Sequence, residues 1–162
     1  LSSGLTKILQ SFEENQNTKM VVLMSEVDFP GMGFVLQKAL PNHSEIRFIT
    51  SQEDVTDYTV WEKYLTDDID MVFISHAYSN TGQLSPIDKV LSLTRSKNIL
   101  SILDVAQSVG IVPINLEALE PDFMIGSSVK WLCGGPGSAY LWVNSKRLPY
   151  CKPSRGSLPP VA

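Results

Sequence analysis

Six short apolar runs recur along the chain, separated by segments of mixed polar and apolar residues. Each run is almost continuously apolar, which is typical of strands that are buried on both faces of a parallel sheet. The segments between most runs are long enough for crossover helices. The strands are predicted over residues 20–24, 46–50, 71–75, 99–104, 122–126 and 139–143. This pattern predicts an α/β fold, with helices on both faces of a mainly parallel sheet.

The predicted helices cover residues 4–14, 31–40, 58–65 and 85–96, with a short turn near 115–119. Pro86 favours the first turn of the fourth helix. No helix fits before the last strand, because "GGPG" (134–137) forms a turn there, so that strand is predicted to be antiparallel. Residues 1–150 are predicted to form one domain core, and the Pro-, Ser- and Gly-rich residues 151–162 a linker or tail.

Composition narrows the function classes. The 162 residues are 43% hydrophobic and 19% charged, which fits one globular domain. The net charge of −4 and the scattered lysines and arginines argue against nucleic-acid binding. The apolar runs are too short to cross a membrane, so we expect a cytoplasmic protein with a small-molecule partner. No metal is predicted, because no metal-ligand spacing connects Cys133, Cys151, His43 and His76.

Three polar residues follow apolar runs, where ligands gather in open α/β sheets. Asp104 ends the fourth run, His76 follows the third, and Lys130 comes shortly after the fifth. Asp104 can be a turn former, His76 a core histidine and Lys130 a loop cation. A buried carboxylate otherwise needs a cation or several donors, and Lys130 is one candidate partner. A catalytic and a structural interpretation of these residues therefore both stand.

The segment "LDVAQSVGIVPINLEALEPDFMIGSSVKWLCGGPG" (103–137) resembles the core of the class V branch of fold-type I pyridoxal-phosphate enzymes. That branch includes cysteine desulfurases and kynureninases. The "DVAQSVGIVPINLEAL" part is most similar to desulfurases, whereas "KWLCGGPGSAYLWV" and "DFPGMGFVLQKAL" (28–40) are more similar to kynureninases. The resemblance covers most of the chain, and it implies the cofactor pyridoxal 5'-phosphate (PLP), an amino-acid substrate and a homodimer.

The resemblance also implies roles for single residues. Lys130 would form the Schiff base with the cofactor aldehyde and shuttle protons, and a crowded, partly apolar site would lower its pKa so that the amine is neutral. Asp104 would keep the pyridine nitrogen protonated. Ala106 would leave flat space against one ring face, and Gln107 would reach the ring hydroxyl or the substrate. Phe29 would stack on the other ring face, its alternative being a core phenylalanine.

Further cofactor contacts are implied at two places. Ser3 and Gly4 open the first predicted helix, where free backbone N–H groups favour a phosphate, although the same residues suit an ordinary helix cap. Ser128 would add another phosphate contact. In "SHAYSNTGQLSPI" (75–87), Ser79 or Asn80 would provide the polar group that the family places near the ring hydroxyl.

Several positions depart from the family. Met32 replaces an aspartate of kynureninases, Gln107 replaces their histidine, and Val129 replaces the polar residue that often precedes the lysine. The N-terminal segment and the C-terminal small domain of the family are expected to be absent, so the chain resembles the central part of a large domain. The leading hypothesis is a PLP-dependent enzyme core, kynureninase-like or class V aminotransferase-like.

Two alternatives remain at this point. The first is sulfur transfer of the cysteine desulfurase type, although Cys133 and Cys151 lie closer to the lysine than the family's nucleophilic cysteine does. The second is a non-catalytic α/β scaffold. The chain alone is expected to lack the arginine that binds the substrate carboxylate in the family.

Overall fold

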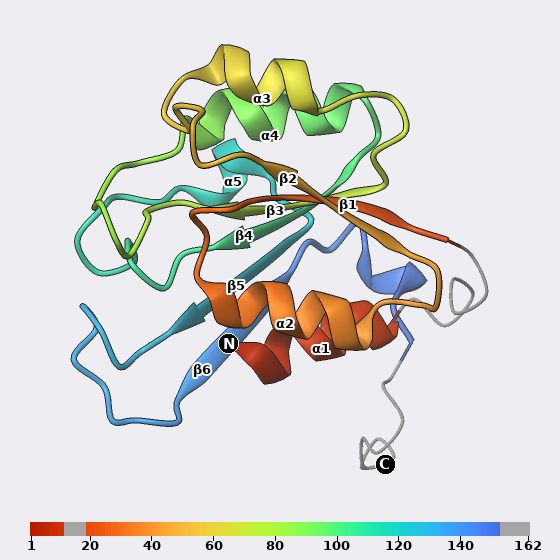
Figure 1. The fold of residues 1–162 in the computed structure, drawn as a ribbon. Coiled ribbons are helices and arrows are strands. Elements are labelled where there is room, and N and C mark those ends of the chain that lie inside the picture. Colours follow the sequence, from red (N-terminus) through yellow and green to blue (C-terminus); the bar gives the residue numbers. More distant parts are fainter. Residues whose placement is uncertain (12–18, 153–162) are drawn as a thin grey trace.

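A computed structural model describes residues 1–11 and 19–152 (Figure 1). In chain order, the elements are α1 (Ser2–Ser11), β1 (Val21–Ser25), α2 (Pro30–Ala39), β2 (Glu45–Ile49), α3 (Tyr58–Tyr64), β3 (Met71–Ser75), α4 (Ile87–Ser96), β4 (Leu100–Asp104), α5 (Leu116–Leu119), β5 (Phe123–Ser127), β6 (Ala139–Val143) and a short 3₁₀ helix (Leu148–Tyr150). The predicted strands are confirmed to within one residue at each end. Residues 12–14 of the first predicted helix and 153–162 of the predicted tail lie outside the described residues.

The six strands form one sheet in the order β2-β1-β3-β4-β5-β6. Neighbouring strands are parallel from β2 to β5, whereas β5 and β6 are antiparallel, with Ser127 opposite Ala139. The predicted mixed α/β sheet is therefore confirmed, including its antiparallel last strand. The tight connection through the "GGPG" turn leaves no room for the crossover helix that a parallel strand requires.

Apolar side chains cover both faces of the sheet. Every residue of β1 and β3 is buried, and successive side chains point alternately into two cores. One core packs under α3 and α4 and contains Leu23, Ile74 and Leu103; the other packs under α1 and α2 and contains Met24, Phe73 and Ile102. Figure 1 shows these helix pairs on opposite faces. Each buried large side chain contributes about 1.5–3 kcal/mol to the stability of the fold. The two packed cores therefore hold the ends of the strands in place.

Helix starts follow local capping chemistry. Asp57 caps α3, because its carboxylate accepts a hydrogen bond from the Thr59 N–H at 2.9 Å. Asn115 caps α5 in the same way. The fourth predicted helix begins two residues later than expected, with Pro86 at the N-cap of α4. No helix within residues 1–11 and 19–152 is both long and apolar enough to cross a membrane.

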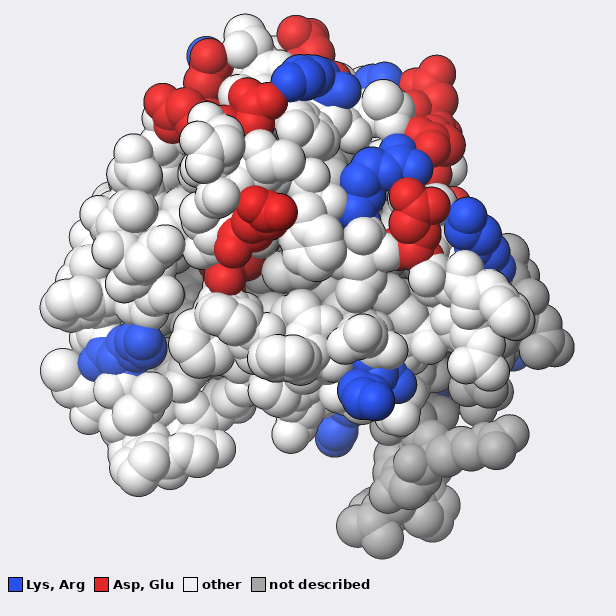
Figure 2. Space-filling model, viewed as in Figure 1, with Lys and Arg blue, Asp and Glu red and all other residues white. Residues whose placement is uncertain are grey.

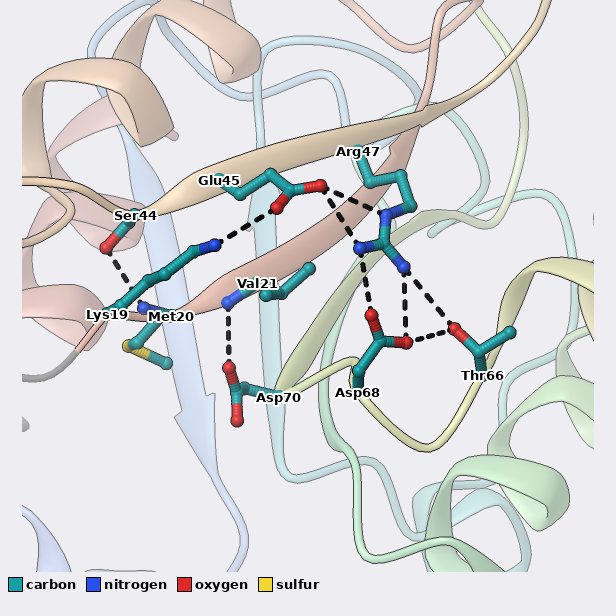
Figure 3. Close-up of polar contacts among 9 residues, drawn as sticks. All are labelled: Lys19, Met20, Val21, Ser44, Glu45, Arg47, Thr66, Asp68 and Asp70. Carbon is teal, nitrogen blue, oxygen red and sulfur yellow. Dashed lines mark hydrogen bonds and ion pairs between the residues drawn. The ribbon is translucent and has the colours of Figure 1, made fainter.

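A network of charged and polar side chains lies along the amino-terminal edge of the sheet (Figure 3). The Arg47 guanidinium contacts Glu45 at 3.1 Å and Asp68 at 2.9 Å. The hydrogen bond from Arg47, followed by one from Thr66, lowers the pKa of Asp68 to about 2. Asp70 accepts a hydrogen bond from the Val21 N–H at 2.7 Å. This network ties β2 to the segment before β3, at the edge opposite the carboxyl ends of the parallel strands.

Candidate active site

Asp104 lies buried at the carboxyl end of β4. Its Oδ1 accepts a hydrogen bond from the Ala106 N–H at 2.8 Å. Asp104 therefore does form the turn that follows β4. Burial raises the pKa of the Asp104 carboxyl to about 6, while the Ala106 N–H and the Lys130 amine lower it. No donor among the described residues bonds to its other oxygen, Oδ2. Asp104 is thus a buried acid with one oxygen left for a further partner.

Lys130 lies in the turn that follows β5, at the same edge of the sheet (Figure 1). The turn is closed by hydrogen bonds from the Gly134 N–H to the Ser128 carbonyl at 2.8 Å and from the Cys133 N–H to the Lys130 carbonyl at 3.0 Å. The Trp131 indole N–H donates to the Gln107 carbonyl at 2.8 Å. This bond links the lysine turn to the loop that follows Asp104, and it keeps Lys130 within electrostatic reach of Asp104.

The surroundings of Lys130 differ from the sequence prediction. The predicted crowded, partly apolar site is wrong for the described residues, because the Lys130 side chain is exposed. Val129, Trp131 and Leu132 are 46%, 52% and 46% exposed. The turn projects beyond the end of the sheet, where neither core reaches it. Enclosure of the amine therefore has to come from groups other than the described residues.

Phe29 precedes the first residue of α2 at the carboxyl end of β1. Its side chain is 55% exposed, so the alternative of a core phenylalanine is wrong. Pro30 and Gly31 begin the helix beneath the ring. A Cβ atom on Gly31 would lie only 2.9 Å from the Phe29 ring, so the glycine leaves space for the aromatic side chain. The geometry leaves a free aromatic face at the edge that holds Asp104.

The first turn of α1 also lies at this edge. Gly4 stands over β5, since a Cβ atom there would be 3.6 Å from the Ile125 side chain, and Ile125 pairs with Asp104. Ser3 is exposed beside it. The free N–H groups of a helix N-terminus favour an anion. Ser128 is less free, because its hydroxyl donates to the Ser138 carbonyl at 3.2 Å.

The loop after β3 is arranged differently from the expectation. Ser79 and Asn80 are exposed in a turn, and no hydrogen bond or ion pair found among the described residues connects Asn80 to Asp104 or Lys130. Tyr78 is buried instead, and its hydroxyl accepts a hydrogen bond from Ser85 at 3.2 Å. His76 is a buried histidine whose Nδ1 has no hydrogen-bond partner in the part of the chain that the structure describes, and burial lowers its pKa.

Two polar residues beside Asp104 were missed by sequence reasoning. Asp28 and Ser75 are 3% and 6% exposed, at the carboxyl ends of β1 and β3. Ser75 pairs with Asp104 across the two parallel strands. Burial, with the Asp104 charge adding to it, raises the pKa of Asp28 to about 7. A polar residue directly after an apolar run is the signal that could have found Ser75, as it found Asp104.

A cavity of about 680 Å³ lies between α2 and β2, and it reaches Asp28 but not Asp104 or Lys130. Exposed apolar residues such as Phe34 and Phe48 line it. We place the candidate site at the strand ends instead, because the acid, the amine and the helix N-terminus converge there. Within the described part of the chain, no three His, Cys, Asp or Glu side chains are grouped so that they could hold a metal ion.

Comparison with known proteins identifies the family. The model of the aminotransferase class V family matches residues 2–157. A bifunctional phosphonoacetaldehyde hydrolase/aminoethylphosphonate transaminase of Clostridioides difficile (strain 630) is 32% identical over 120 residues, which cover 71% of this chain and 19% of that protein. The kynureninase of Burkholderia mallei (strain SAVP1) is 28% identical over 151 residues, which cover 88% of this chain and 35% of that protein.

A solved structure shows the same fold. It is a lysine-to-alanine mutant of C-DES with glycine covalently linked to its PLP cofactor, and it matches with a TM-score of 0.82 and 21% identity over 94% of this chain and 41% of that one. The chain belongs to the aminotransferase class V family. It spans between about a fifth and two fifths of the length of these three proteins.

Proposed function

We propose that the chain is the core of a PLP-dependent enzyme that acts on an amino acid, in the manner of kynureninases or class V aminotransferases. The observation that carries this proposal is the placement of the buried Asp104 and of Lys130 at one carboxyl edge of a class V sheet. When bound, PLP supplies an electron sink for a substrate carbanion. The free Oδ2 of Asp104 fits a cationic ring nitrogen, which would compensate the cost of burying the carboxylate.

The other residues of this edge then have distinct tasks. The Lys130 amine bonds covalently to the cofactor and moves the substrate proton. Ala106, which is small and buried, leaves flat space beside Asp104. Ser3 and Gly4 offer N–H groups to the phosphate. Gln107 extends from the loop that Trp131 fixes.

Ser128 and Asn80 keep the roles that the family resemblance implies. Ser128 is a further phosphate contact, because it lies in the lysine turn. Asn80 is the polar group near the ring hydroxyl.

We also propose that the complete protein is a homodimer that covers the lysine turn. Figure 2 shows charged side chains gathered over α3 and α4 at the top of the view, with few at the lower left, where Figure 1 places the β5–β6 loop. The exposed Val129, Trp131 and Leu132 of that loop form an apolar group that is costly to leave in water.

Titration of the complete protein with PLP tests the proposal. A shift of the cofactor's visible absorption, saturating at one cofactor per chain, is the expected result. A protein that leaves the spectrum unchanged supports the scaffold alternative. The desulfurase alternative predicts in addition a persulfide on Cys133 or Cys151 after incubation with free cysteine.

Replacing Phe29 by alanine should weaken cofactor binding by about 1–3 kcal/mol, through lost stacking and apolar contact. Phe34→Ala is the matched control, because Phe34 is also exposed on α2 but lines the separate cavity. Spectroscopic titration of both variants provides the comparison. Equal affinities in the two variants would show that the Phe29 ring does not touch the cofactor.

Replacing Gly134 by alanine should lower cofactor loading several-fold. The added Cβ would lie 2.7 Å from the Ser128 Cβ, so the turn that presents Lys130 has to shift. Gly135→Ala is the control, since nothing lies within 4 Å of a Cβ there. The ratio of bound cofactor to protein is the measurement, and equal loading of both variants would argue against a lysine held by this turn.

A further inference from the structure

The carboxyl group of Asp28 is buried where β1 meets α2. Its Oδ2 accepts a hydrogen bond from the Ser25 N–H at 2.7 Å, and the Asp28 N–H donates back to the Ser25 carbonyl at 3.1 Å. These two bonds close the turn that presents the neighbouring Phe29. The other oxygen, Oδ1, is fully buried, and no donor within residues 1–11 and 19–152 reaches it in hydrogen-bond geometry. A carboxylate in this position would have one oxygen without a partner, which is costly.

Ser75 lies beside both Asp28 and Asp104. Residues that pair across parallel strands point to the same face, so the Ser75 and Asp104 side chains lie side by side. The Ser75 side chain also lies close enough to Asp28 to lower its pKa, although burial outweighs it. Asp28, Ser75 and Asp104 therefore form a buried row across the carboxyl ends of β1, β3 and β4.

The charged and polar groups that face Asp28 differ from those that face Asp104. Asp28 faces Asp104 from β4 and the buried Tyr78 hydroxyl from the loop after β3, and among the described residues its other interactions are with Ser25 and Ser75. Asp104 faces the Lys130 amine as well as the Ala106 N–H. Two buried acids this close do not both ionise readily, and the negative charge favours Asp104, the acid that faces the cation.

We propose that Asp28 is a positioning residue that carries a proton around neutral pH and so supports a charged Asp104, the two acids then sharing one negative charge. The consequence for cofactor binding rests on the proposed function; the shared charge itself does not. A cation bound at Asp104 would hold the negative charge there, and it would also lower the pKa of Asp28, because an added positive charge favours the ionised form of a nearby acid. Binding of the cofactor near pH 7, where Asp28 is partly protonated, then releases part of that proton.

The first test uses the complete protein without cofactor. Because the pKa of Asp28 is raised from 3.8 to about 7, the folded state holds a proton between these pH values that the unfolded chain has released. Stability therefore falls as pH rises from about 4 to 7 and levels off above that range. Asp28→Asn should reduce this fall by several degrees of Tm, because a neutral amide reproduces the acceptor and the donor of a protonated carboxyl.

The control for the loss of one charge is Asp67→Asn, at an exposed acid that pairs with Lys97 on the surface. Its Tm should follow the wild-type pH dependence. If Asp28→Asn also ran parallel to the wild type between pH 4 and 8, the protonated Asp28 would be contradicted. This outcome does not depend on whether PLP binds.

The second test measures PLP binding at pH 7 by calorimetry in two buffers of different ionisation enthalpy. The number of protons released on binding should be larger for wild type than for Asp28→Asn. Asp28→Ala should bind at least five-fold more weakly, and asparagine should restore most of that loss. Equal proton release in wild type and Asp28→Asn, or asparagine no better than alanine, would overturn the positioning role. A wild type that binds no PLP would contradict the proposed function instead and leave the first test to decide the shared charge.

Discussion

Asp104→Asn should lower the affinity of the complete protein for PLP by about 3 kcal/mol or more, which is roughly 100-fold. The carboxylate is buried at the end of β4 with one oxygen free for a cation. Asparagine keeps the size and can still accept the Ala106 N–H bond, but it cannot balance the charge of a protonated ring nitrogen. Spectroscopic titration at pH 8, where the wild-type acid is ionised, measures the loss.

The same substitution should have the opposite effect on the protein without cofactor. The pKa of Asp104 is raised from 3.8 to about 6, so wild-type stability falls as pH rises through this window and stays lower above it. Asp104→Asn removes that fall and should be at least as stable as wild type at pH 8. A variant that binds PLP as tightly as wild type would show that Asp104 is only a turn former.

Lys130→Ala should bind PLP only without a covalent bond and should lose turnover by about 100-fold or more, because the amine is also the proposed acid and base. Lys130→Arg should not restore activity, since a guanidinium stays protonated and cannot attack an aldehyde. Lys146→Ala is the control, because Lys146 is an exposed lysine that pairs with Glu120. Assay of the three variants with the same amino acid compares them directly.

If Lys130 were only a loop cation, its replacement would change stability slightly and leave turnover intact. Turnover of Lys130→Ala equal to that of the Lys146→Ala control would support that interpretation. Because the Lys130 side chain is exposed, its replacement should cost little stability, and the comparison then measures the role of the amine.

The fold was predictable because its strands are nearly uniformly apolar. The bounds predicted from the run "MVFIS" (71–75) agree with those of β3 at both ends. A strand buried on both faces is apolar along its length, so its ends are easy to recognise. The antiparallel β6 was predictable from the "GGPG" turn alone. The start of α4 was misplaced by two residues, because Pro86 fits an N-cap as well as a first turn.

The site was only partly predictable. Asp104 and Lys130 could be brought to one edge, because strand ends in a parallel sheet share that edge. Asp28 could not, because its burial depends on the turn that it forms with Ser25. The exposure of Lys130 was also missed. The apolar residues around it do not indicate by themselves whether another part of the protein covers them. Tyr78 was passed over since its burial follows from the turn at Gly82, not from periodicity.

Borohydride reduction of the complete protein supplied with PLP tests the central claim most directly. Reduction makes the bond between the cofactor and the lysine permanent, and peptide mapping then locates the pyridoxyl group. The account predicts a single labelled peptide that contains Lys130, and no label in Lys130→Ala. A label on another lysine, or no label on a folded protein saturated with PLP, would contradict it.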